Sequence, residues 1–69
     1  MKARDVKIGQ LIKTEYGLAT VMRFFAPKSI GCVLVTSFYR PGTPGYKKFQ
    51  QGEWIYIQGF DFDKAEIVV

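Results

Sequence analysis

The sequence predicts one all-β domain made of five short antiparallel strands. The chain has 69 residues, which gives room for a single domain spanning 1–69. No window keeps the apolar spacing of a helix, whereas short runs rich in Val, Ile, Thr, Tyr and Phe are separated by Gly and Pro. We therefore expect strands at residues 10–15, 18–25, 31–39, 53–58 and 65–69.

The expected connections are turns and one long loop. Between the first two strands, Tyr16 and Gly17 suit a hairpin, because glycine adopts the positive φ of such turns. Pro27 ends the second strand by removing a backbone donor. Residues 40–52 form a loop with two Pro-Gly steps, and a loop of this length in a small domain is usually functional or disordered.

Three segments, IGQLI at 8–12, GLATV at 17–21 and AEIV at 65–68, resemble the layout of small SH3-like barrels. This superfamily includes KOW and Tudor domains and many short bacterial and phage proteins. The resemblance implies a five-stranded antiparallel SH3-like barrel with a short 3₁₀ turn over residues 59–64, where Phe60 and Phe62 would close one end. The fold hosts many functions and implies none by itself.

The composition argues against an enzyme, a cofactor and a metal site. There is no histidine, and Cys32 is the only cysteine, which we expect to be a buried, reduced thiol. No phosphate-binding glycine motif is present, and Asp61 and Asp63 fall in an expected solvated turn. The sequence shows neither a signal peptide nor a membrane span, so we expect a cytoplasmic protein with no membrane contact.

Charge is distributed unevenly along the chain. Residues 1–48 contain nine of the ten Lys and Arg residues and carry a net charge of +7, whereas residues 49–69 carry −3. Such asymmetry favours an anionic partner, either nucleic acid or an acidic protein surface.

Basic and aromatic residues around the long loop form the first candidate site. Cations can neutralise phosphates while rings stack on unpaired bases, as in single-strand binders. The alternative is a solvated loop whose rings pack on the domain. The candidate nucleic-acid-binding residues are Arg23, Lys28, Tyr39, Arg40, Tyr46, Lys47, Lys48 and Phe49.

The second candidate is a protein interface, used by an accessory subunit, a phage-encoded module or a homo-oligomer. If Ile55 and Ile57 face the core, then Trp54 and Tyr56 face outwards. The reverse register, or a loop folded over both rings, is the alternative. Residues 32–35 are apolar without alternation, as in a strand covered on both faces, so Val33 and Val35 join this candidate surface.

Overall fold

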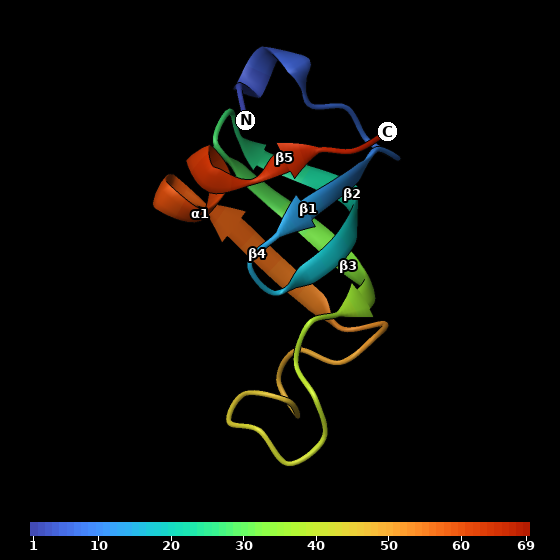
Figure 1. Cartoon of the computed structure of the whole chain (residues 1–69). Helices are drawn as coiled ribbons and strands as arrows, with labels where there is room; N and C mark the ends of the chain where they lie inside the picture. The colour runs from blue at the N-terminus through green and yellow to red at the C-terminus, as the bar shows by residue number, and fades with distance from the viewer.

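The computed structural model describes all 69 residues and contains one five-stranded antiparallel sheet (Figure 1). The strand order is β4-β3-β2-β1-β5, so β4 and β5 are the two edges. The elements are η1 (Ala3–Asp5), β1 (Leu11–Thr14), β2 (Gly17–Ala26), β3 (Ser29–Ser37), β4 (Trp54–Gln58), α1 (Gly59–Lys64) and β5 (Glu66–Ile67).

All five expected strands are present, and the all-β prediction is confirmed. The last strand is shorter than expected, because only Glu66 and Ile67 pair regularly with β1. Val68 and Val69 nevertheless donate their N–H groups to the Leu11 carbonyl, so the chain stays attached to β1 to its last residue. No helix is long and apolar enough to cross a membrane.

The expected 3₁₀ turn before the last strand is wrong. Residues Gly59–Lys64 form one short α-helix, and the Ala65 N–H donates to the Asp61 carbonyl at 3.1 Å, which is an α-helical bond. Phe62 of this helix is fully buried, so tertiary packing stabilises a helix that six residues could not maintain alone. The only 3₁₀ turn is η1, near the N-terminus.

The first hairpin turns one residue earlier than expected. Glu15 and Tyr16 form the turn, and Gly17 is already the first residue of β2. A Cβ at position 17 would overlap the carbonyl oxygen of Thr36 on β3, and φ there is +150°. Gly17 is thus required for the close approach of two strands as well as for its backbone angle.

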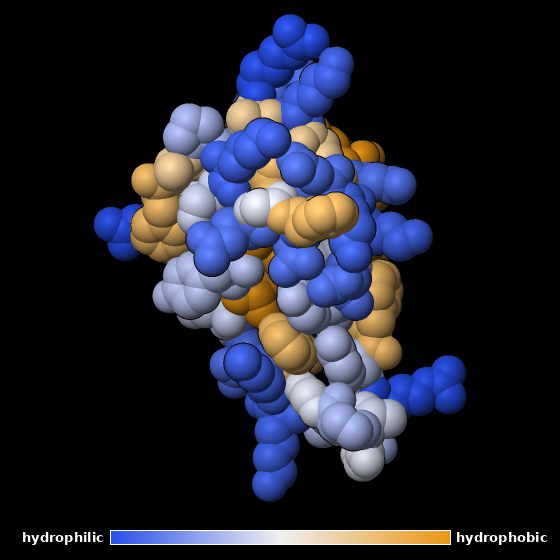
Figure 2. Space-filling model, turned by 90° about the vertical axis from the view of Figure 1, so that its left-hand side faces the viewer, coloured by the Kyte–Doolittle hydropathy of each residue, from blue (hydrophilic) through white to orange (hydrophobic).

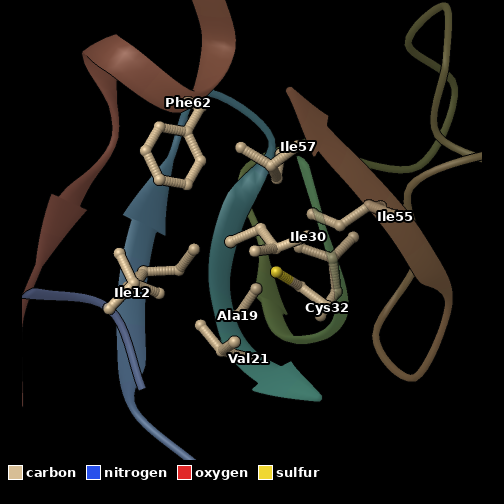
Figure 3. Close-up of a cluster of buried hydrophobic side chains, with 10 residues drawn as sticks. Ile12, Ala19, Val21, Ile30, Cys32, Ile55, Ile57 and Phe62 are labelled. Carbon is tan, nitrogen blue, oxygen red and sulfur yellow. The ribbon is translucent and has the colours of Figure 1, made fainter. Parts of the chain in front are cut away.

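The sheet curves around an apolar core (Figure 3). Phe62 points from α1 towards Ile12, and Ile57 and Ile55 enter from β4. Phe62 thus covers the core as expected, but Phe60 is 80% exposed and takes no part in it. The ten core residues are Val6, Ile12, Ala19, Val21, Ile30, Cys32, Leu34, Ile55, Ile57 and Phe62.

Candidate binding surface

Three exposed aromatic rings lie on the outer face of β2, β3 and β4. On β4, Ile55 and Ile57 are buried, whereas Trp54 is 49% and Tyr56 64% exposed, which confirms the register expected from alternation. Phe25, near the end of β2, is 51% exposed, and its ring centroid lies 5.7 Å from that of Tyr56. We call Phe25, Trp54 and Tyr56 the outer ring cluster.

Gly31 of β3 forms the floor beneath this cluster. It pairs with Tyr56 in the sheet and is buried although it lies on the outer face. A Cβ at position 31 would come within 3.0 Å of Cζ3 of Trp54 and 3.1 Å of Cε2 of Phe25. The two rings therefore lie close over the bare backbone of Gly31, while about half of each side chain stays exposed to solvent.

Phe25 and Gly31 were not among the predicted site residues. An isolated glycine inside a strand pattern often marks close approach of another group, and this was the available signal. The identity of the approaching rings could not be read from it, because Phe25 and Trp54 are far apart in the chain.

Positive charge accompanies the outer ring cluster at both ends. At one end, the Arg23 guanidinium lies 5.5 Å from the centroid of the Phe25 ring, and at the other, Lys48 lines a groove together with Trp54 and Tyr56. Only Lys28 and Lys64 of the ten cations form salt bridges, and both pairs are exposed and weak. Arg23 and the loop cations are therefore free to meet an anionic partner.

A second aromatic group is built into the domain. The Phe49 ring stacks on Tyr16 with centroids 4.3 Å apart and on Tyr39 with centroids 5.2 Å apart. Phe49 thus has a tyrosine on each face and none free for a base. We call Tyr16, Phe49 and Tyr39 the inner stack.

A hydrogen bond attaches the inner stack to α1. The Tyr16 hydroxyl donates to Oδ2 of Asp61 at 3.1 Å, which links the first hairpin to α1. Partial burial, and then the carboxylate of Asp61, raise the pKa of Tyr16. Tyr39 and Phe49, two of the rings predicted to stack on bases, therefore also attach the loop to the first hairpin.

The long loop is a chain of hydrogen-bonded turns that projects below the sheet (Figure 1). The Thr43 N–H donates to the Arg40 carbonyl, Tyr46 to Thr43, and Phe49 to Gly45 at 3.0 Å. These turns border an open hollow lined by Gly42, Thr43, Gly45, Tyr46, Lys47 and Lys48.

An apolar groove lies beside β4, between the outer ring cluster and the inner stack. In the space-filling view a strongly hydrophobic patch is visible near the middle of the face, surrounded by paler side chains, with the loop below (Figure 2). The groove has a volume of about 320 Å³ and is lined by Tyr16, Lys48, Phe49, Trp54, Ile55 and Tyr56. Lys48 borders both the groove and the loop hollow, so it connects the loop to the outer ring cluster.

The structure separates the predicted nucleic-acid-binding residues into two sets. Arg40, Tyr46, Lys47 and Lys48 lie in the loop that follows β3, whereas Lys28 lies in the turn before it. A nine-residue strand spans about 26 Å, so these two sets sit at opposite ends of the sheet. Lys28 forms an exposed pair with Asp63, at 3.0 Å.

Within the chain, residues 32–35 are fully covered on one face only, so the long loop does not cover the second face. Cys32 and Leu34 are buried, but Val33 is half-buried and Val35 is 42% exposed, so this strand alternates. On the outer face of β3, Phe25 and Trp54 lie over Gly31, whereas Val35 is left exposed. A shift in register between β2 and β3 around Leu18 and Ala19 accompanies the change from covered to open surface.

No group of three or more Cys, Asp, Glu or His residues is arranged to hold a metal ion. Burial raises the pKa of the Cys32 thiol to about 12, so it remains protonated at neutral pH. Comparison with known proteins gives no further guide, because no family model, no curated protein and no solved structure matches the chain.

Proposed function

We propose that this chain is a non-catalytic module that binds single-stranded nucleic acid across the outer face of β2, β3 and β4. The observation that carries the proposal is the outer ring cluster, in which two of the three exposed rings lie over Gly31 and cations stand at both ends. Bases of any sequence present a flat π-face, and each stacked base contributes about 1–3 kcal/mol.

The geometry suits an extended strand. Trp54 and Tyr56 are two residues apart on one face, which places their Cα atoms about 6.7 Å apart along β4. Arg23 beside Phe25 would neutralise phosphates at one end, and Lys48 at the groove would do so at the other. Lys47 and Tyr46 extend this path into the loop hollow.

We further propose that the fold is an SH3-like barrel. Three features support it: the order β4-β3-β2-β1-β5, the long β2 that pairs with both β1 and β3, and a short helix between β4 and β5.

The first experiment measures oligonucleotide binding through Trp54, which is the only tryptophan of the chain. We expect single strands to quench its fluorescence, and labelled single strands to bind more tightly than duplexes in anisotropy titrations. Trp54→Ala should weaken binding by about 1–3 kcal/mol, roughly 5- to 150-fold. Phe60→Ala is the matched control, because it also removes an exposed ring, and Phe60 does not belong to the outer ring cluster.

Salt dependence tests the role of the cations. For single strands the slope of log K against log salt is about −0.7 per neutralised phosphate. The double variant Lys47→Ala/Lys48→Ala should make this slope shallower by roughly 1.4 if both side chains contact phosphates. Absence of binding by the unaltered chain at low salt would refute the proposed function.

One observation favours a second function, binding to a protein. Eleven large hydrophobic residues are exposed, including Val35 and Phe38 as well as the outer ring cluster. Exposed apolar surface of this extent on a small domain often marks a protein interface. Such binding would involve Val33, Val35, Trp54 and Tyr56 and would depend weakly on salt. If this is the function, Trp54→Ala should abolish binding to the protein partner, and the unaltered chain should not bind oligonucleotides.

A further inference from the structure

The outer edge of β4 presents backbone groups that have no partner in the chain. β4 pairs only with β3, and the Leu34 N–H donates to the Glu53 carbonyl at 3.0 Å. Because bonding alternates along antiparallel strands, Ile55 and Ile57 also bond to β3. The N–H and C=O groups of Trp54 and Tyr56 and the N–H of Gln58 therefore point away from the sheet, whereas the Gln58 C=O, at the N-cap of α1, accepts the first bond of that helix.

This edge lacks the features that usually protect an exposed strand. Residues 54–58 read WIYIQ, without a charge or a proline, and their pairing with β3 has no bulge. Natural edges carry lysine, proline or a bulge, because a flat apolar edge recruits another strand. We propose that β4 pairs antiparallel with β4 of a second copy of this chain, about a two-fold axis at Tyr56.

The register follows from which groups point outwards. With the axis at Tyr56, this residue faces Tyr56 of the second copy, and Trp54 faces Gln58. The N–H and C=O groups of both Tyr56 residues then bond to each other, and the Gln58 N–H of each copy meets the Trp54 C=O of the other. No charge meets a like charge along the paired strands. The contact is isologous, so it closes at two copies and does not continue into a fibre.

Charge complementarity supports an antiparallel partner of the same chain. The loop at one end of β4, residues 38–53, contains Arg40, Lys47 and Lys48 against the single carboxylate Glu53, whereas α1 at the other end carries Asp61 and Asp63 against Lys64. Antiparallel pairing brings the basic loop of each copy beside the acidic helix of the other. A parallel arrangement would place like charges together instead.

The dimer goes beyond the proposed function and does not rest on it. The backbone edge of β4 and the outer faces of its rings are different surfaces, so both can be engaged at once. Pairing would place the outer ring clusters of two copies side by side on one continuous sheet.

The mass in solution gives the first test, without nucleic acid. Sedimentation velocity of the full chain should show a species of twice the 7.9 kDa chain mass. Tyr56→Lys should dissociate it at least tenfold more readily, because it places two cations together at the axis. Val35→Lys adds the same charge on the inner strand β3, and the dimer should persist. Circular dichroism verifies that both variants fold.

Disulfide trapping tests the register. Cα atoms of directly opposed residues lie about 5.5 Å apart, within disulfide range. Tyr56→Cys should therefore form a covalent dimer under mild oxidation. Trp54→Cys should not, since the two copies of residue 54 would lie about 13 Å apart. Buried Cys32 stays unreactive in both variants.

A monomer at every concentration up to millimolar would overturn the proposal, as would a dimer that Tyr56→Lys leaves intact. Equal trapping of Trp54→Cys and Tyr56→Cys would overturn the register. None of these results would affect oligonucleotide binding, which is measured separately, so failure of the dimer and failure of the proposed function are distinguishable.

Discussion

The inner stack and the outer ring cluster both consist of aromatic residues, but the inner stack has a structural role and the outer ring cluster is exposed. In the inner stack, Phe49 is enclosed by Tyr16 and Tyr39, and the three rings attach the long loop to the first hairpin. In the outer ring cluster, Trp54 and Phe25 touch the sheet through Gly31 and keep one face in solvent. The availability of a ring depends on what covers its faces, which its neighbours in sequence do not reveal.

This difference matters for a small domain. A 69-residue chain buries only about 60% of the surface its unfolded form exposes, so its stability margin is thin. Rings used to order a loop are unavailable to a ligand, and rings left exposed contribute little to stability. Substitutions in the inner stack should therefore lower mainly the stability of the fold, and substitutions in the outer ring cluster should lower mainly the affinity for a ligand.

Phe49→Ala should have the largest effect on stability. Full burial of a phenylalanine is worth about 3–5 kcal/mol on truncation to alanine, and Phe49 is half-buried, so we expect a loss of about 2 kcal/mol. Urea denaturation measures it, with Phe60→Ala as a control that should change stability by less than about 0.5 kcal/mol. Equal effects of the two substitutions would remove the distinction between a structural and an exposed ring.

Alkaline pH should weaken the inner stack through Tyr16. Its pKa is raised in the folded protein above the ordinary value of 10.0, mainly by burial and then by Asp61. The unfolded chain therefore loses this proton first, and the contribution to stability is complete below pH 10 and declines as pH rises above it. Urea midpoints compared at about pH 9 and pH 11 should fall more steeply for the unaltered chain than for Tyr16→Phe. Parallel declines would show that Tyr16 is not responsible.

Gly31→Ala should have a small effect on stability and a measurable one on binding. The added methyl group meets the far ends of two side chains, Trp54 and Phe25, which can swing outwards. We expect a change in unfolding free energy below about 1 kcal/mol. Oligonucleotide affinity should fall, and the Trp54 emission should shift to longer wavelength as the ring leaves the sheet. Unchanged emission and affinity would mean that the floor at Gly31 does not position the rings.

Local patterns predicted much of the fold. Alternation in WIYIQ gave the correct facing of Ile55, Ile57, Trp54 and Tyr56, because side chains of a strand point alternately to its two faces. At residues 32–35 an uninterrupted apolar run predicted a strand covered on both sides, and the chain itself fully covers only one of them. Such a run does not say whether a second layer exists to cover it.

The candidate site was predicted only in part. The loop cations were identified, since charge is visible in the sequence, but Lys28 proved to lie at the other end of the sheet with Asp63. Tyr39 and Phe49 were assigned to bases because rings beside lysines are typical of single-strand binders. Their partner Tyr16 lies far from them in the sequence, so the stack that uses them could not be read from local spacing.

The sequence by itself determined the all-β class, the five strands, the buried thiol and the face on which each residue of β4 lies. These depend on composition, on the two-residue period of a strand and on Gly and Pro, which are all local. Only the tertiary structure decided that residues 59–64 form an α-helix, that Gly31 supports two rings, and that one aromatic group is covered while the other is exposed. Each of these depends on contacts between residues distant in the chain, and such contacts form only when the strands take their order in the sheet.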